Sequence, residues 1–254
     1  MLIPVIPVIN KWNKIENSIF PNNNHNSTAI INFNSKLDST INLPRFTKFL
    51  RDITYLNTLS LDIFIGILLG DAYFKSGKGN NVRIGFKQSI INFPFFWTVF
   101  TQLSHYCSSI PRLEFTKLKN KKYGLLILET RSYLIFNQLY DLFIIEGKKG
   151  IKEELYHYLS PISLAYWIMC DGLSNQYGLT LCTDNFTVKD TITLINILKL
   201  RFNLDCSLHY YSKYPRIYVK ASSMNQLRLI VERHIIPFSQ YKLHKGRRWK
   251  NSIN

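Results

Sequence analysis

The sequence predicts a mixed α/β protein that is built from two tandem copies of one α/β unit. The first observation is an order of elements that occurs twice: a helix ending at an aspartate, then strand, helix, strand, helix and a short basic segment. The second is spacing, because the two aspartates, Asp71 and Asp171, lie 100 positions apart (171 − 71). The third is the alternation of apolar and polar residues in several predicted strands, which is typical of sheets with one buried face.

In the first unit the apolar run "FIGILLGDA" predicts a buried helix that ends at Asp71. The elements expected after it are a strand at 81–89, a helix at 93–107, a strand at 123–131, a helix at 132–145 and the basic "EGKKGIK" at 146–152. In the second unit "LAYWIMCDG" predicts a helix that ends at Asp171. After it we expect strands at 177–183, 207–213 and 216–222, helices at 186–202 and 223–236, and the basic "SQYKLHK" at 239–245.

The residues before the first unit differ in composition from the rest of the chain. The stretch "FPNNNHNSTAIINFNSK" is rich in asparagine and shows no period, so residues 1–58 are predicted to be a loosely ordered N-terminal extension. The expected division is therefore an extension at 1–58, a first repeat at 59–160, and a second repeat with a basic tail at 161–254.

Charge predicts the kind of partner. The 254-residue chain has 32 Lys and Arg against 16 Asp and Glu, a formal net charge of +16, which points to nucleic acid or to an anionic membrane surface. The apolar runs are far shorter than the roughly 20 residues of a membrane-spanning helix. The start "MLIPVIPVIN" resembles neither a signal peptide nor a transit peptide. The four cysteines have neither metal-site nor disulfide spacing.

The polar face of the predicted strands supplies candidate nucleic-acid contacts. In "VRIGFK" the residues Arg83 and Lys87 alternate with apolar ones, and "SLHYYSK" and "RIYVKA" show the same pattern. A cationic and aromatic open face suits phosphate and groove contacts, whereas an ordinary solvated face is the alternative. The predicted nucleic-acid contacts are Lys75, Arg83, Lys87, His209, Tyr211, Lys213, Arg216 and Lys220.

The aspartates at the two helix ends need a physical reason. A carboxylate there faces the negative end of the helix dipole, so a cation should compensate, either a divalent metal or a lysine. Gly66 and Gly70 lie on one stripe of the first helix and would allow a second helix to approach closely. Two such helices side by side would bring Asp71 and Asp171 together as a hard oxygen site suited to Mg²⁺. The alternative is that the aspartates only terminate the helices.

The two motifs resemble those of the LAGLIDADG homing endonucleases, in the branch that carries two motifs in one chain. The flanking strings "GDAYFKS", "LSPISLAYWIMCDG" and "IIPFSQYKL" support the resemblance, which runs from about Leu61 to about Gly246. It implies an α+β fold of two pseudo-symmetric αββαββα repeats, with saddle-shaped antiparallel sheets that straddle DNA. It also implies that Asp71 and Asp171 bind metal with Gly70 and Cys170, and that Lys149 and Lys242 are catalytic. Lys148 competes with Lys149 for that role.

The implied activity is site-specific hydrolysis of both strands of double-stranded DNA by an intron-encoded homing endonuclease. Mg²⁺ is the expected cofactor, with Mn²⁺ able to substitute, and the protein is expected to act as a monomer without a membrane partner. The abundance of residues with AT-rich codons indicates an organellar gene, with the mitochondrion preferred over the chloroplast. The alternatives are a maturase that binds its own intron RNA and a non-catalytic, ribosome-associated RNA-binding protein of the same fold.

Overall fold

The computed structural model describes residues 40–76, 81–118 and 121–244. Most of the predicted extension and the predicted basic tail from residue 245 lie outside the described residues. Those described belong to one compact unit that spans 38–254. No helix among them is long and apolar enough to cross a membrane.

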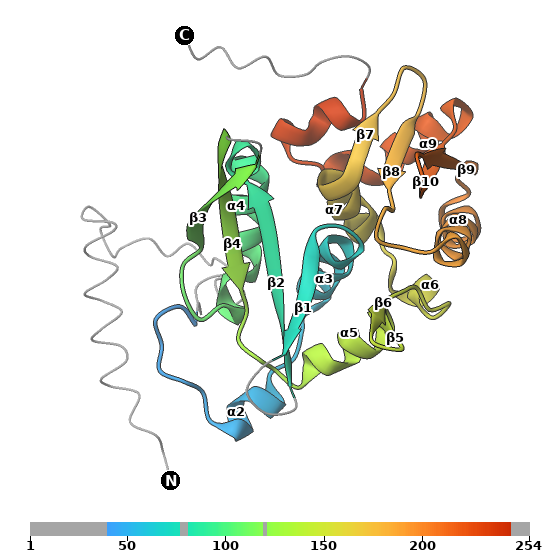
Figure 1. The fold of residues 1–254 in the computed structure, drawn as a ribbon. Helices are drawn as coiled ribbons and strands as arrows, with labels where there is room; N and C mark the ends of the chain where they lie inside the picture. Colours follow the sequence, from blue (N-terminus) through green and yellow to red (C-terminus); the bar gives the residue numbers. More distant parts are fainter. Residues whose placement is uncertain (1–39, 77–80, 119–120, 245–254) are drawn as a thin grey trace, which may run out of the picture. The chain divides into compact units, whose positions relative to one another are not determined.

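The described chain carries one succession of elements twice (Figure 1). A short helix, α2 (Lys48–Ile53), precedes the first half. The first half consists of α3 (Thr58–Leu69), β1 (Ala72–Ser76), β2 (Val82–Ser89), η2 (Ile90–Asn92), α4 (Phe93–Leu103), η3 (Ser104–Tyr106), β3 (Arg112–Leu118), β4 (Lys121–Glu129) and α5 (Ile135–Phe143). The connection to the second half contains β5 (Ile144–Ile145), β6 (Lys148–Lys149) and α6 (Leu155–Tyr158).

The second half repeats the order of the first. It consists of α7 (Pro161–Asp171), β7 (Gly172–Ser174), β8 (Leu179–Cys182), α8 (Val188–Phe202), β9 (Cys206–Tyr211), β10 (Tyr214–Val219), η4 (Ala221–Ser223), α9 (Met224–Val231), η5 (Glu232–His234) and η6 (Pro237–Lys242). Both four-stranded sheets are antiparallel and have the same strand order, β1-β2-β4-β3 and β7-β8-β10-β9. The predicted α+β fold of two αββαββα repeats is therefore confirmed.

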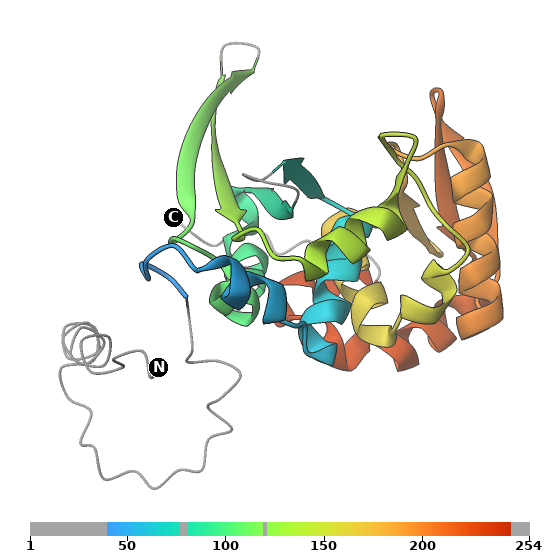
Figure 2. The same cartoon turned by 90° about the horizontal axis from the view of Figure 1, so that it is seen from below.

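Helices α3 and α7 form the centre of the described structure (Figure 2). Both are apolar around their whole circumference, and a helix of that kind must be covered on every side. Ile63, Phe64, Ile67, Trp167 and Ile168 are accordingly fully buried. Their beginnings are set locally, because Asn57 caps α3 by accepting from the Ser60 amide, and Ser160 caps α7 just before Pro161.

Strand register decides which face of each sheet packs on helices. In the first sheet Ala72 pairs with Phe86 and Phe74 with Ile84, which places these apolar side chains on the covered face. In the second sheet Ile217 pairs with Leu181 and Val219 with Leu179 in the same way. The alternation predicted for 82–87 and 216–219 is thus confirmed, and the intervening polar residues lie on the opposite, open faces.

Three strands, β1, β3 and β7, were not anticipated from the residue pattern alone. All three lie at the edge of a sheet, and β7 has only three residues. β1 and β7 are short, and a short edge strand is defined by its pairing partner more than by its own sequence, so its periodicity is weak.

The last part of the predicted extension is ordered, which differs from the prediction of a loosely ordered segment. Residues 47–53 form capped helix α2, and Arg131 donates to the backbone carbonyls of Thr40, Leu43 and Pro44. The Arg131 guanidinium also lies 4.5 Å from the centre of the Phe46 ring. Arg131, which belongs to the first repeat, therefore helps to hold residues 40–46 in place. No local sequence pattern predicts these contacts.

Candidate active site

The two central helices meet through small residues near their C-terminal ends. A Cβ atom placed on Gly66 would lie 2.5 Å from the Ser163 carbonyl oxygen and 2.6 Å from the Tyr166 Cβ. One placed on Gly70 would lie 2.4 Å from the Cys170 Cβ. The expected close approach of the two helices is observed, with Gly66 against Ser163 and Tyr166 and Gly70 against Cys170.

This approach brings the two motif aspartates to one place. Asp171 is the last residue of α7, as expected, and its Oδ2 lies 3.3 Å from the position that a Cβ on Gly70 would occupy. The first motif differs in detail, because α3 ends at Leu69 and is capped by Gly70, so Asp71 lies in the turn that leads into β1. The expectation that Asp71 is the last helical residue is therefore wrong by two positions, although its place beside Asp171 is kept.

Two lysines compensate the negative ends of the central helices. The Lys149 Nζ donates to the carbonyl oxygens of Gly70 at 3.1 Å and Ala72 at 3.4 Å. The Lys242 Nζ is buried and donates to the carbonyls of Ile168, Met169 and Cys170 at 3.2, 2.7 and 3.0 Å. The carbonyls of Gly70, Met169 and Cys170 lie at the C-terminal ends of the central helices, so an ammonium group there satisfies hydrogen bonds and also compensates the dipole. Lys148, the competing candidate, is exposed on β6 and has no described contact with the site.

The four charged side chains perturb one another. Burial and the neighbouring charge of Asp71 raise the pKa of Asp171 to about 7. Partial removal from water also raises the pKa of Asp71, although that residue keeps solvent access, so we expect the larger effect at Asp171. Burial lowers the pKa of Lys149 to about 8 and lowers that of Lys242, against the opposing pull of the carboxylates. Titratable groups perturbed together in this way are typical of catalytic centres.

Gln88 is a site residue that the sequence reasoning missed. Its side chain is buried on the covered face of β2, and its Nε2 donates to the Asp71 Oδ2. The Asn92 Nδ2 in turn donates to the Gln88 Oε1 at 2.9 Å, so the glutamine amide is fixed from both sides. A polar residue at an apolar position of the alternating strand was the available signal.

The donor set suits a divalent cation whose coordination is completed by substrate. Among the described residues no group of three or more His, Cys, Asp and Glu side chains comes together, so the two carboxylates stand as a pair. Mg²⁺ commonly binds through one or two carboxylates together with water and substrate phosphate oxygens, and this arrangement fits that mode. The carbonyls of Gly70 and Cys170 accept from lysine ammonium groups, which compete with a metal at those oxygens.

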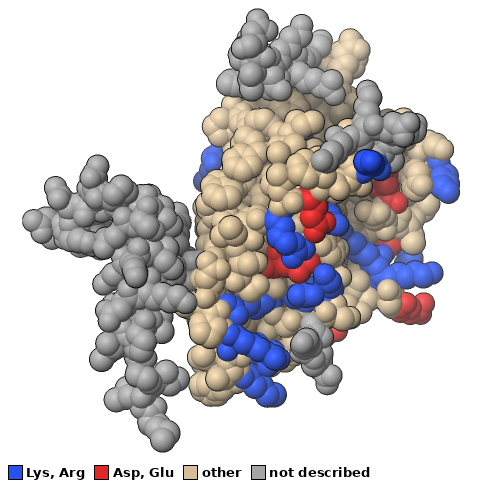
Figure 3. Space-filling view, turned by 60° about the vertical axis from the view of Figure 1, so that its left-hand side comes forward, with Lys and Arg blue, Asp and Glu red and all other residues tan. Residues whose placement is uncertain are grey.

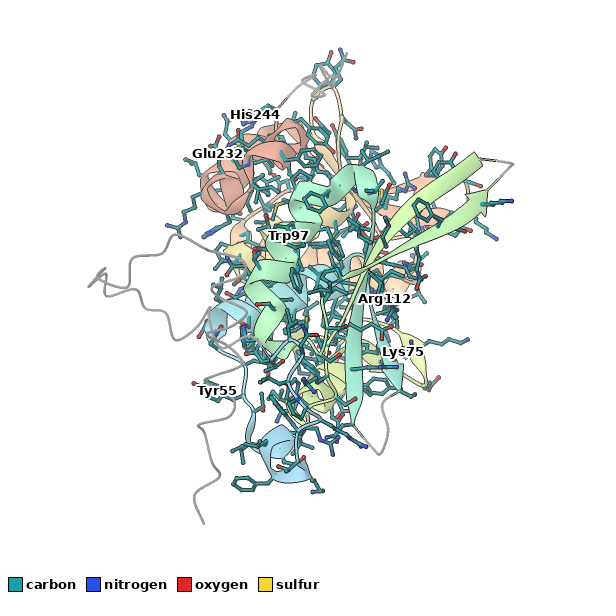
Figure 4. The ribbon with its side chains drawn as sticks, turned by 90° about the vertical axis from the view of Figure 1, so that its left-hand side faces the viewer. Tyr55, Lys75, Trp97, Arg112, Glu232 and His244 are labelled. Carbon is teal, nitrogen blue, oxygen red and sulfur yellow. The ribbon has the colours of Figure 1, made fainter. Side chains whose placement is uncertain are left out.

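The open face of the first sheet carries the predicted cations around one carboxylate. Lys75 lies opposite Arg83 in the strand register, and both contact Glu129, at 3.0 and 3.4 Å. Arg112 reaches the same carboxylate at 3.4 Å. Burial alone would raise the pKa of Glu129, but these three cations hold it below its ordinary value. Figure 4 labels Lys75 and Arg112 at the strands and Trp97 on α4, which covers the other face.

The open face of the second sheet combines aromatic rings with one strong ion pair. Arg216 donates through Nε and Nη2 to both carboxylate oxygens of Asp184, at 2.9 and 2.8 Å, and lies 4.4 Å from the Tyr211 ring centre. The His209 ring stacks on Tyr218. Two predicted contacts lie just outside the strands, Lys213 in the β9–β10 turn and Lys220 directly after β10.

The cations on the two open faces fall into two groups, those with a carboxylate partner and those without one. Within the described residues Lys87, Lys213 and Lys220 have no carboxylate in salt-bridge range, whereas Lys75, Arg83 and Arg216 do. Figure 3 shows lysine and arginine side chains gathered on one part of the surface with carboxylates among them. A polyanion on these faces would meet the three free cations first and would compete with Glu129 and Asp184 for the others.

Comparison with known proteins agrees with this architecture. The sequence model of the LAGLIDADG DNA endonuclease family matches residues 61–227. The chain is 33% identical over 202 residues to the cytochrome b mRNA maturase bI2 of Saccharomyces cerevisiae. The aligned region covers 74% of this chain and 48% of the maturase, so this chain spans about half the length of that relative. It is 31% identical over 208 residues to the "Probable intron-encoded endonuclease 1" of Wickerhamomyces canadensis, covering 75% of this chain and 86% of that one.

A solved structure gives the same result at the level of the fold. The homing endonuclease I-WcaI, bound to its DNA recognition sequence, superposes with a TM-score of 0.71 at 29% sequence identity. The match covers 76% of this chain and 89% of that chain.

Proposed function

The chain belongs to the LAGLIDADG DNA endonuclease family, and from that premise we propose that it is a site-specific homing endonuclease that cuts both strands of DNA. The observation that carries the proposal is the meeting of Asp71 and Asp171 where α3 and α7 come together, with Lys149 and Lys242 beside them. The division into repeats at 59–160 and 161–254 is part of the proposal. So is an origin in an organellar intron, the mitochondrion being favoured by the similarity to a cytochrome b maturase.

Asp71 and Asp171 would hold Mg²⁺, or Mn²⁺ in its place. When bound, a divalent cation neutralises charge on a phosphate and lowers the pKa of water, which are the needs of phosphodiester hydrolysis. The proposal keeps the two carboxylates as ligands. The carbonyls of Gly70 and Cys170, which the family resemblance adds as ligands, accept from lysine ammonium groups and are therefore less suited to bind the metal.

The remaining residues of the site would position groups and hold protons. Gln88 orients the Asp71 carboxylate, since its amide is itself fixed by Asn92. Lys149, with a pKa of about 8, keeps its proton at neutral pH and presents a positive charge beside the carboxylates. A fixed positive charge in a partly buried site stabilises the negative charge that develops on phosphate oxygens or on the leaving oxygen.

The open faces of the two sheets would bind the DNA. Cations there would contact backbone phosphates, and side chains that reach base edges would give sequence preference. The proposed contacts are Lys75, Arg83, Lys87, His209, Tyr211, Lys213, Arg216 and Lys220. One chain carries both sheets, so the protein needs no second copy for the two half-sites and is proposed to act as a monomer.

The proposal is tested by cleavage of DNA that carries the intronless form of the insertion site. Purified protein with Mg²⁺ should linearise a plasmid with this sequence and leave a plasmid with a scrambled site intact. Mn²⁺ should support the reaction, and chelation of metal should stop it. Tight and specific DNA binding without cleavage in either metal would exclude the enzyme and leave a binding protein of this fold.

Replacement of either site lysine by methionine should slow cleavage by about 10–10³-fold, the loss typical of one electrostatic stabiliser. Lys149→Met should affect mainly the rate, with little change in DNA affinity. Lys242→Met should in addition lower the free energy of unfolding by about 1–3 kcal/mol, because the carbonyls of Met169 and Cys170 lose their donor and that of Ile168 keeps only the Gly172 amide. Single-turnover cleavage, gel shifts in Ca²⁺ and urea unfolding measure the three quantities.

Lys148→Met is the matched control for the lysine variants, because this neighbour is exposed and makes no described contact with the site. It should cut at the wild-type rate. Equal slowing by Lys148→Met and Lys149→Met, or a parallel fall in affinity and rate, would make the lysines ordinary phosphate contacts.

A second candidate function is a maturase that binds its own intron RNA, favoured by the 33% identity to a protein named as an mRNA maturase. Retention of both carboxylates favours cleavage, since RNA binding has no need of them. Splicing of the precursor RNA by the Asp71→Asn variant, together with the absence of DNA cleavage by the wild type, would establish the maturase instead.

A further inference from the structure

An arginine-lined cavity lies at the end of the first sheet, away from the aspartates. It has a volume of about 410 Å³ and is lined by Arg45, Arg51, Arg83, Arg131, Ser76 and Ser132, among others. Ser76 ends β1 and Arg83 stands near the start of β2, while Arg131 and Ser132 follow β4. Helix α2, which carries Arg51, lies beside these strand ends in Figure 1. We call this cavity the arginine pocket.

The arginine pocket has positive charge that its own surroundings leave unbalanced. None of the described residues that line it is acidic. Arg131 donates to backbone carbonyls, and Arg83 shares Glu129 with two other cations. Arg45 and Arg51 make no salt bridge within the described residues, and Asp52, which interacts electrostatically with Arg51, is paired directly with Lys48 at 2.6 Å.

Two guanidinium groups also have unsatisfied donors. The Nε atoms of Arg51 and Arg83 are buried and have no hydrogen-bond partner within the described part of the chain. A buried donor without a partner costs about 1–3 kcal/mol. These buried atoms are closed to a ligand, but the four arginines that line the cavity favour an anion with several oxygen atoms as its occupant.

We propose that the arginine pocket binds a backbone phosphate of the DNA, beyond the base pairs that the sheet contacts. The guanidinium fork fits a phosphate through two parallel hydrogen bonds, and the serine hydroxyl groups add donors. The pocket is continuous with the open face of the sheet, because Arg83 lines it and lies opposite Lys75 in the strand register. This inference rests on the proposed function, since it takes the open face as the DNA side.

The arginine pocket extends the interface with residues that precede the matched family region. Arg45 and Arg51 lie before residue 61, where that match begins. Arg131, which fixes residues 40–46, lies within it. The segment at 40–58 therefore acquires a role as a phosphate clamp that lengthens the contacted DNA on the side of the first repeat.

The test compares Arg45→Gln and Arg51→Gln with Lys48→Gln in the complete protein. Lys48 is the control because it lies on the same helix as Arg51 and close to Arg45 in the chain, carries the same charge and does not line the pocket. DNA affinity is measured in Ca²⁺ over a series of salt concentrations. Each arginine variant should reduce the slope of log K against log[salt] by about 0.9, the value for one phosphate contact, and Lys48→Gln should leave it unchanged. Arg45 is exposed, so Arg45→Gln carries the test even if Arg51→Gln lowers the melting temperature.

Trimmed duplexes locate the contact. Shortening the DNA on the flank beside the first repeat should remove the difference between wild type and variants, and shortening the opposite flank should not. If both arginine variants keep the wild-type slope of log K against log[salt], the phosphate clamp is overturned. Specific cleavage by the wild-type protein would still support the proposed function in that case. Absence of specific DNA binding by the wild type would remove the proposed function itself.

Two further outcomes assign the pocket to another ligand. Inorganic phosphate could raise the melting temperature of the wild type and not that of the two arginine variants. If the salt dependence of DNA binding is also unchanged in these variants, the arginine pocket is a site for free phosphate. Weaker binding of intron RNA with unchanged binding of DNA would make it an RNA contact. Either result overturns the proposal.

Discussion

Asp71→Asn and Asp171→Asn should each abolish double-strand cleavage while DNA binding in Ca²⁺ stays at the wild-type level or improves. Each substitution keeps the size of the side chain and removes a charge from the pair of carboxylates at the meeting of α3 and α7. The loss should be at least about 10³-fold, as expected when a metal ligand is removed from a site that depends on metal for both water activation and charge stabilisation.

The same variants should be more stable than the wild type in metal-free buffer, in a way that depends on pH. The pKa of Asp171 rises from its ordinary value to about 7 on folding, so the folded protein holds this proton more tightly than the unfolded chain. The contribution of Asp171 to wild-type stability is therefore fully present below about pH 4 and is lost as the pH rises through about 7, where the carboxylate must ionise beside Asp71.

At pH 8 Asp171→Asn should raise the free energy of unfolding by about 1–3 kcal/mol, because one pKa unit corresponds to about 1.4 kcal/mol and a partly exposed group realises only part of the shift. Mg²⁺ should stabilise the wild type and not the variant. Urea unfolding between pH 4 and 8, with and without Mg²⁺, measures both effects.

Asp205→Asn is the control for loss of one negative charge, because Asp205 is an exposed partner of Lys199. It should retain cleavage and show no added stability at pH 8. Unfolding of both motif variants, combined with no effect of metal on the wild type, would make the aspartates structural residues that terminate the central helices.

Gly66→Ala should lower the free energy of unfolding, which is the reverse of the usual effect within a helix. Alanine normally favours a helix over glycine by about 1 kcal/mol. Here the added Cβ would lie 2.5 Å from the Ser163 carbonyl oxygen and 2.6 Å from the Tyr166 Cβ. The helices must move apart, so we expect a loss of about 1–3 kcal/mol. Cleavage should fall as well, because the same contact sets the distance between the carboxylates.

Gly124→Ala is the control for Gly66→Ala, since its added Cβ would meet the Ile90 side chain at 3.3 Å, a contact that a small side-chain shift relieves. Its cleavage rate should equal that of the wild type. Urea unfolding and single-turnover rates separate the two glycines. Equal stability of Gly66→Ala and the wild type would mean that the central helices adjust freely.

The outline of the fold could be derived from the sequence because the two halves repeat one strong pattern. All-round apolar runs require buried helices, and alternation in 82–87 and 216–219 requires sheets with one open face. The pairing of α3 with α7 follows from Gly66 and Gly70, since glycine stripes serve close helix contact. The two aspartates followed from their positions at the ends of these runs.

What the tertiary structure decided was which groups meet across long distances in the chain. Gln88 reaches Asp71, Lys149 reaches Gly70, and Lys242 reaches the end of α7, although no local pattern links these residues. The same holds for the arginine pocket, where Arg45 and Arg51 of the segment at 40–58 converge with Arg83 and Arg131 from two other segments. Local sequence determines helices, strands and their buried faces through backbone preference and the hydrophobic effect. Charge pairing depends on distance in space, and only the packing of helices, strands and connecting segments against one another fixes that distance.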